Sequence, residues 1–354
     1  MRTPAVFPAR TAPILSILAV VAVLSGGTSR PSAAPGASAE ALPALPDAGA
    51  LQALDPRFAA AAAAVRKKDC EAAFRELTPL TEGRDEAARR ARLIAGLYAY
   101  TCDSRTRALQ WLASSGAGHD PLEDWRLFAL AETAHQTGQV ALAHDSFTHL
   151  LADYRSSPLW RRALAVATER SYEDGDAAGA LELVRWSREQ TELGGETIGP
   201  IERIAWRLGQ DRGDRELLDG AARRLLVHAP VVADELNVVE RFRPAKGSLS
   251  WASFLSPEEL RTRAQSLLAA GLPGPATMAF EAIPGAARNL EWRLASARAL
   301  LADGRPGEAL SRLAAAQPAN DDERSLVLLE QARVETALAS QPAGRKRAAV
   351  AERA

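Results

Sequence analysis

Apolar residues along this chain recur at helical spacing, in pairs of segments that are separated by short turns. Four of these turns share one pattern, in which a glycine is followed five positions later by an alanine: Gly138 and Ala143, Gly175 and Ala180, Gly271 and Ala276, and Gly304 and Ala309. Glycine readily adopts the left-handed conformation that ends a helix, and alanine lets another helix approach closely. The pattern predicts stacked helical hairpins with a repeat of roughly 33 to 38 residues.

The two helices of a predicted hairpin carry different patterns. Apolar side chains surround most of the segment 122–134, whereas in the segment 140–154 they form a single stripe. A helix that is apolar on most sides must be covered twice, while one stripe indicates one exposed face. We therefore expect an inner and an outer layer of helices. Tryptophans in the first helices favour core packing over stacking on sugar rings: Trp125, Trp160, Trp206 and Trp292.

The amino terminus has the order of a secretory signal. Arg2 and Arg10 flank the start of the chain, an apolar run covers residues 13–24, and small residues that suit cleavage occur at 32–34 and 37–39. The run is about 12 residues long and a bilayer span needs about 20, so we expect no stable membrane span after signal cleavage. The expected location is the bacterial periplasm.

The helical period is lost between residues 238 and 256, where 243–248 is a cluster of helix breakers. Helix resumes at Ser256, with Glu259 at the spacing of a capping box. The predicted organisation is a signal peptide (1–36), a flexible leader rich in alanine and proline (37–54), a first block of helical repeats (55–240), a linker (241–256), a second block (257–339) and a disordered basic tail (340–354).

The last predicted helix, residues 325–339, is the first half of a hairpin without a second half. Each repeat leaves one side apolar unless a neighbour covers it. We therefore expect incomplete cover for four of its residues: Leu326, Leu328, Leu329 and Val334. The alternatives are a docking edge for another domain or protein, and cover by the short tail or by simple fraying of the helix end.

Composition agrees with an all-α fold. Hydrophobic residues make up 47% of the chain and aromatic residues 5%, so the core must be built mainly from alanine and leucine. The 43 basic and 44 acidic residues leave a formal net charge of -1, which predicts no nucleic-acid partner. Almost all the positive charge is arginine. Its even spread favours a compositional bias over a site for phosphate or carboxylate.

Two cysteines would meet an oxidising compartment after export. Cys70 begins the second helix of the first predicted hairpin and Cys102 ends the next helix. Because these helices are antiparallel neighbours, we expect a structural disulfide between them. Two inert buried thiols, or a reactive or metal-binding pair, are the alternatives, and no Cys-x-x-Cys spacing supports the last.

No catalytic residue, metal ligand or cofactor is predicted. His144 and His149 are five residues apart, whereas two ligands on one helix stand three or four apart, and His135 shares no better spacing with them. Motifs for acyl transfer, nucleotide binding and dinucleotide binding are lacking in the sequence. Paired carboxylates at 258–259 and 321–322 stand at helix starts, where they favour the helix dipole.

Three parts of the sequence resemble known repeats: the hairpin 138–154 with the following 157–159, the helix restart at 256–260, and the segment 267–271 with Ala276. They look like tetratricopeptide repeats, and residues 55–339 are similar to the α-superhelical portion of bacterial soluble lytic murein transglycosylases. In that family a separate carboxyl-terminal domain cleaves peptidoglycan through a glutamate in a Glu-Ser motif, ahead of a Gly-Leu-Met-Gln stretch. Neither motif occurs here, so no residue inherits the catalytic role. The expected fold is a tetratricopeptide-like α-solenoid, a superhelix of antiparallel helix hairpins.

These observations favour an exported, non-catalytic helical-repeat scaffold in the cell envelope. Its expected partner is an envelope protein or peptide, with a glycan such as peptidoglycan as a further candidate, bound on a concave surface. The alternative is a fragment or degenerate copy of a soluble lytic murein transglycosylase that acts on peptidoglycan. The absence of that family's motifs favours a protein that is not an enzyme.

Overall fold

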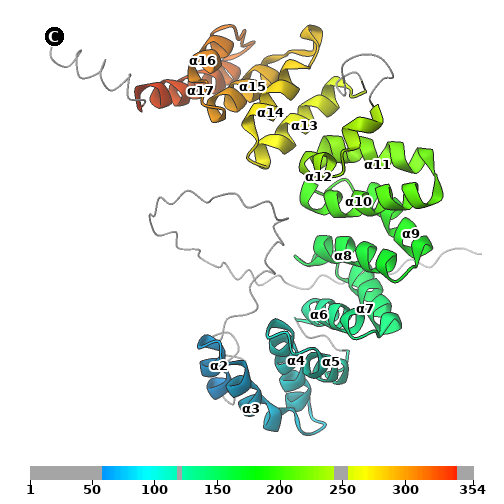
Figure 1. Ribbon diagram of the computed structural model, residues 1–354. Coiled ribbons are helices and arrows are strands. Elements are labelled where there is room, and N and C mark those ends of the chain that lie inside the picture. The colour runs from blue at the N-terminus through cyan, green and yellow to red at the C-terminus, as the bar shows by residue number, and fades with distance from the viewer. Residues whose placement is uncertain (1–57, 118–121, 243–253, 341–354) are drawn as a thin grey trace, which may run out of the picture. The chain divides into compact units, whose positions relative to one another are not determined.

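A computed structural model describes residues 58–117, 122–242 and 254–340, all of which belong to one compact unit over residues 43–354 (Figure 1). The described residues form α-helices and two short 3₁₀ helices and contain no strand. The α-helices are α2 (Ala59–Arg66), α3 (Cys70–Thr81), α4 (Glu86–Thr101), α5 (Arg105–Ser114), α6 (Glu123–Gln136), α7 (Val140–Asp153), α8 (Trp160–Glu173), α9 (Ala177–Arg188), α10 (Gly195–Arg212), α11 (Arg215–His228), α12 (Pro230–Glu235), α13 (Pro257–Ala269), α14 (Pro273–Glu281), α15 (Leu290–Ala302), α16 (Pro306–Ala314) and α17 (Asp321–Ser340).

The helices pack as hairpins, each of which contacts the next along the chain. The pairs are α2 with α3, α4 with α5, α6 with α7, α8 with α9, α10 with α11, α13 with α14, and α15 with α16. The second helix of a hairpin also contacts the first helix of the following one, as α5 does with α6 and α7 with α8. First helices meet as well, α4 with α6 and α8 with α10. The predicted all-α, tetratricopeptide-like fold of the α-solenoid class is confirmed.

The glycine turns and their partner alanines have the predicted roles. The four turn glycines all have a positive φ, between 73° and 79°, as the left-handed end of a helix requires. The alanines five positions later are at most 3% exposed. A larger side chain at these alanines would separate the two helices of the hairpin, because no space is left around them.

The inner and outer helices differ as the sequence indicates. Helix α6 buries ten of its fourteen residues, whereas α7 buries five of fourteen. The predicted burial of first-helix tryptophans also holds for three side chains that are at most 8% exposed: Trp160, Trp206 and Trp292. Trp125 is half-buried and packs against the core of the first hairpins.

The first predicted block ends in two short helical elements. After α11 the chain forms α12 and a 3₁₀ helix, η2 (Val238–Phe242), and α13 then begins with the predicted capping box of Ser256 and Glu259. Helix α11 packs against α13, and Val227 lies in one core cluster with Leu260. The linker boundaries stay a prediction, because residues 243–253 lie outside the described ones. The predicted signal peptide, the leader and residues 341–354 of the tail lie outside them too.

The predicted exposure of the last helix is correct for three of four residues. Leu326, Leu328 and Leu329 are 47%, 57% and 49% exposed. Val334 is buried, and its predicted exposure was wrong, because α17 packs against both α15 and α16 and places Val334 in their core. No helix of the described residues is both long enough and apolar enough to span a membrane.

Candidate functional site

The two cysteines are joined where the sequence places them. Cys70 is the first residue of α3 and Cys102 follows the last residue of α4, and their Sγ atoms form a disulfide with the Cα atoms 6.2 Å apart. The bond links two neighbouring antiparallel helices of successive hairpins across 32 residues of sequence. A crosslink of this kind stabilises the fold mainly by restricting the unfolded chain. It ties the first hairpin to the second.

The three histidines do not come together. His135 Nε2 lies 3.1 Å from Oδ1 of Asp174, and His149 Nε2 lies 3.1 Å from Oδ2 of Asp153 on its own helix. Within the ranges that the structure describes, no three or more His, Cys, Asp or Glu side chains are arranged to hold a metal ion. His135 and His149 therefore lie beside carboxylates on separate helices.

A largely buried ion pair connects the first helices of two successive hairpins. Glu132 on α6 accepts a hydrogen bond of 3.1 Å from Nε of Arg170 on α8, and Glu132 is 8% exposed. Tyr100 on α4 lies near the same pair, and burial, reinforced by the charge of Glu132, raises the pKa of Tyr100 to about 12. The phenol thus stays protonated at neutral pH and cannot act as a base there. This cluster fixes neighbouring helices in register.

A recurring hydrogen bond fixes how one hairpin meets the next. The last four carbonyl groups of a helix have no partner within that helix. At several junctions, a side chain in the first two turns of a helix donates to a carbonyl in the last turn of an earlier one: Arg92 to Thr81 (3.0 Å), Arg126 to Leu112 (3.2 Å), Trp160 to Leu151 (3.0 Å), Arg263 to Leu226 (2.6 Å) and Trp292 to Phe280 (2.9 Å). These bonds satisfy buried polar groups and orient the incoming helix.

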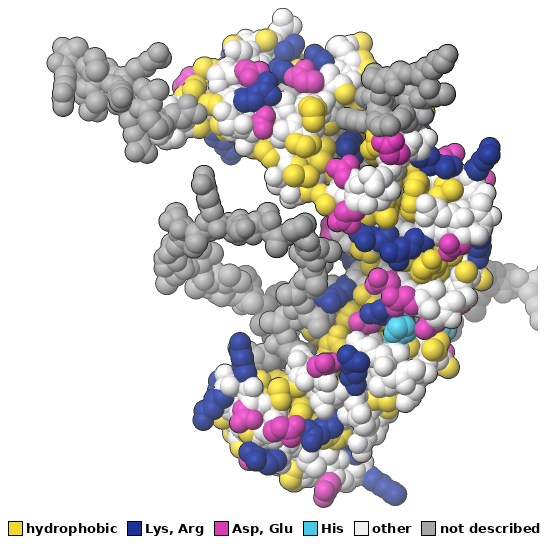
Figure 2. Space-filling view, in the orientation of Figure 1, with side chains coloured by type: hydrophobic (Ala, Val, Ile, Leu, Met, Phe, Trp, Pro, Cys, Tyr) yellow, Lys and Arg dark blue, Asp and Glu magenta, His cyan; other side chains and the backbone are white. Residues whose placement is uncertain are grey.

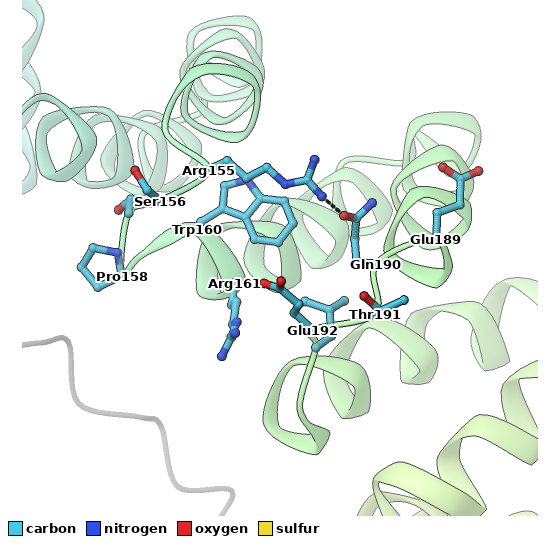
Figure 3. A pocket seen from close by; sticks show the side chains of 11 residues that line it. Arg155, Ser156, Pro158, Trp160, Arg161, Glu189, Gln190, Thr191 and Glu192 are labelled. Carbon is cyan, nitrogen blue, oxygen red and sulfur yellow. Dashed lines mark hydrogen bonds between the residues drawn. The ribbon is translucent and has the colours of Figure 1, made fainter. Parts of the chain in front are cut away.

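A pocket of about 530 Å³ lies at one of these junctions, where α7 meets α8; we call it the Trp160 pocket (Figure 3). Residues 155–158 and the first turn of α8 form one wall, and residues 189–193, between α9 and α10, form the other. Trp160 is 5% exposed and packs edge-to-face against Trp186 with the ring centroids 5.4 Å apart. Two successive hairpins therefore build the pocket jointly.

Arg155 connects the two walls of the Trp160 pocket. Its guanidinium lies 5.4 Å from the ring centroid of Trp160 and donates a hydrogen bond to Oε1 of Gln190, as the dashed line in Figure 3 shows. The amide nitrogen of Gln190 donates in turn to the Trp186 carbonyl at 3.0 Å. These contacts hold the walls in place without a ligand, which lowers the entropic cost of binding.

Two exposed side chains at the rim of the Trp160 pocket keep unused hydrogen-bonding groups. Arg161 and Thr191 make no side-chain hydrogen bond or ion pair with any residue that the structure describes. Arg161 points away from the indole in Figure 3. The lining carries two arginines and two glutamates, so its formal charge is balanced, and Glu189 points away from the other side chains. The pocket can accept a polar, uncharged chain such as a peptide backbone.

A second pocket, of about 430 Å³, has the same construction where α14 meets α15; we call it the Trp292 pocket. Trp292 is 2% exposed, and Arg288 from the preceding turn lies 4.7 Å from its ring centroid. In both pockets an arginine from the loop covers the indole and another arginine follows the tryptophan directly, Arg161 in one and Arg293 in the other. Neither indole offers a free face to a sugar ring.

A dipeptide in the sequence marks both pockets. The dipeptide Trp-Arg occurs at 125–126, 160–161, 206–207 and 292–293, each time in the first helix of a hairpin. At 126 the arginine is buried and donates to the carbonyl of Leu112, whereas Arg161 and Arg293 line pockets. The recurrence coincides with three of the junctions, but it does not show which arginine is buried and which lines a pocket.

No family model matches the sequence, and no curated protein matches it significantly. A tetratricopeptide repeat protein from Parabacteroides merdae is 14% identical, with 79% of this chain and 99% of that one covered and a TM-score of 0.39. A thermophilic tetratricopeptide repeat protein from Thermus thermophilus is 20% identical, with 58% and 98% covered and a TM-score of 0.24. The tetratricopeptide repeat domain of P58(IPK) is 14% identical, with 82% and 91% covered and a TM-score of 0.21. Identities and scores this low give no information on function, and the fold rests on the helix packing described above.

Proposed function

We propose that this chain is exported to the periplasm and acts there as a non-catalytic helical-repeat scaffold. Its partner is a segment of an envelope protein or a peptide, which binds at the Trp160 pocket. The observation that carries this proposal is the pair of unused donors at the rim, Arg161 and Thr191, beside walls that hydrogen bonds join. An open, polar pocket with fixed walls suits an extended peptide, whose backbone presents both donors and acceptors.

The tryptophans favour a protein partner over a glycan. Recognition of a sugar ring by stacking requires an accessible aromatic face. Trp160 and Trp292 are 5% and 2% exposed, and an arginine lies over each ring. Basic and acidic side chains are interspersed on the face shown in Figure 2, so this face offers no broad basic surface to a polyanionic glycan. Peptidoglycan is therefore the weaker candidate.

Export is supported by the order of basic, apolar and small residues over 1–36 and by the disulfide between Cys70 and Cys102. Stable disulfides are typical of the periplasm and other oxidising compartments. A fusion of residues 1–36 to mature alkaline phosphatase, which is active only after export, tests this part. Activity in intact bacteria is the expected result, and an inactive cytoplasmic fusion protein would overturn the proposed location.

Binding at the Trp160 pocket can be tested by site-specific photocrosslinking in the native host. A benzophenone side chain replaces Thr191 at the pocket or, as the matched control, Thr106, an exposed threonine on α5. We expect one discrete protein adduct from position 191, absent from position 106 and lost when Arg161→Glu is added. Equal adducts at both positions, or no effect of Arg161→Glu, would contradict the site.

The non-catalytic character has a separate test. Purified chain is incubated with murein sacculi, and the soluble fraction is analysed for muropeptides. We expect none above the level of a buffer control. Release of muropeptides would overturn the proposal in favour of the alternative, a protein derived from the soluble lytic murein transglycosylases.

A further inference from the structure

The Trp292 pocket differs from the Trp160 pocket in its charge. Arg288, Arg293 and Arg312 line it together with a single acidic residue, Glu308. Glu308 is already engaged, because both of its carboxylate oxygens accept hydrogen bonds from Arg305. The lining therefore has an excess of positive charge, although the whole chain has a formal net charge of -1. A cationic pocket attracts an anionic group.

Two of the three arginines are held in fixed positions. The guanidinium carbons of Arg288 and Arg312 lie 4.7 and 4.5 Å from the ring centroid of Trp292. Arg288 also donates to the main-chain carbonyls of Ile283 (2.9 Å) and Glu281 (2.7 Å). The Glu281 carboxylate lies near both guanidiniums, 3.6 Å from that of Arg288 and 2.5 Å from that of Arg312. Stacking and hydrogen bonds thus prepare the wall of the pocket before any ligand arrives.

Arg293 is different, because it is half-buried at the pocket and pairs with no carboxylate in the described part of the chain. Two other arginines in this part of the chain do pair with a carboxylate on a later helix. Arg261 on α13 lies 3.2 Å from the Glu291 carboxylate on α15, and Arg298 on α15 lies 2.6 Å from that of Glu330 on α17. Arg293 thus lacks the partner that its neighbours have.

We propose that the Trp292 pocket binds an acidic peptide segment of a partner protein, with one carboxylate of the segment paired with Arg293. The inference rests on the proposed function in that the partner is a protein. Carboxylate is the anion that this part of the chain already uses, at Glu281 and Glu308, and guanidinium binds it through paired hydrogen bonds. A volume of about 430 Å³ accommodates a side chain with its flanking backbone rather than a single ion.

The test is fluorescence anisotropy with a labelled tetraglutamate peptide, blocked at both ends, and the full chain. Tetraglutamine is the uncharged control peptide. We expect tetraglutamate to bind and tetraglutamine not to bind, with affinity that falls as salt is added. Arg293→Gln should weaken tetraglutamate binding by about tenfold or more, because a hydrogen bond to a charged group is lost. Arg185→Gln, which removes one exposed charge on α9, should leave binding unchanged.

Each other result overturns the proposal in a distinct way. Equal binding of both peptides, no binding of either, or equal affinity of wild type and Arg293→Gln would exclude an acidic peptide at this pocket. Binding of inorganic phosphate without binding of tetraglutamate would identify a small-anion site. Cosedimentation with phosphatidylglycerol vesicles that depends on Arg293 would identify a lipid surface instead. Crosslinking from position 191 reports on the Trp160 pocket. A negative result with tetraglutamate would therefore overturn the acidic-peptide site at the Trp292 pocket but not the proposed function.

Discussion

The hydrogen bond between the Trp160 indole and the Leu151 carbonyl can be removed by one substitution, Trp160→Phe. The bond is 3.0 Å long and buried, and no other donor to the Leu151 carbonyl is present among the described contacts. Phenylalanine keeps an aromatic ring in the same place but cannot donate. A buried carbonyl without a partner costs about 1 to 3 kcal/mol, so we expect a loss of about 2 kcal/mol in the free energy of unfolding.

The equivalent substitution at the other pocket, Trp292→Phe, is the control. Trp292 also donates to a carbonyl, that of Phe280 at 2.9 Å, but the Phe280 carbonyl accepts a second hydrogen bond of 3.2 Å from the Ile283 N–H. Both tryptophans are almost completely buried, at 5% and 2% exposure, so the two substitutions share the cost of a smaller ring. We therefore expect the control to lose less stability than Trp160→Phe.

Urea unfolding of the full chain, followed by circular dichroism, measures both losses. Because a repeat array can unfold in parts, hydrogen exchange of the amides in α7 and α8 should accompany it and locate the change. Faster exchange confined to this junction in Trp160→Phe is the expected result. Equal losses in both variants would show that ring volume, and not the unsatisfied carbonyl, sets the cost, and the proposed role of these hydrogen bonds would fail.

Three further predictions concern the stack itself. Reduction of the Cys70–Cys102 bond, which spans 32 residues, should lower the free energy of unfolding by about 4 kcal/mol. Identical melting with and without reductant, or alkylation of both thiols in the native protein, would contradict this. Gly96→Ala should cost about 1 to 3 kcal/mol, because its Cβ would lie 2.6 Å from a leucine side chain on α5, and an unchanged urea midpoint would refute it. Hydrogen bonds from Arg223 lower the pKa of Glu259 to about 2. The contact therefore stabilises the fold above the unfolded pKa of about 4.3, and this stabilisation is lost as the pH falls toward 2. The difference in stability between wild type and Glu259→Gln should shrink over that pH range, and a constant difference would contradict the argument.

The hairpins could be predicted because their determinants are local. A glycine that ends a helix and an alanine five positions later act within one hairpin, and both are visible in the sequence. The capping box at Ser256 is local in the same sense. The burial of Val334 could not be predicted in this way, since it depends on how α17 lies against two earlier helices. Whether a residue at a repeat edge is covered is a tertiary property.

The pockets lie between these two cases. Some first-helix tryptophans only pack in the core, and others also donate a hydrogen bond to a carbonyl of the preceding helix. The sequence around the tryptophan looks the same in the two cases. The donating tryptophans stand at different distances from their acceptors: Trp160 follows Leu151 by nine residues, and Trp292 follows Phe280 by twelve. The arginine after the tryptophan also differs from one junction to another. Arg126 donates to Leu112 and is buried, whereas Arg161 and Arg293 reach pockets. The same dipeptide therefore contributes a buried hydrogen bond at one junction and lines a pocket at two others.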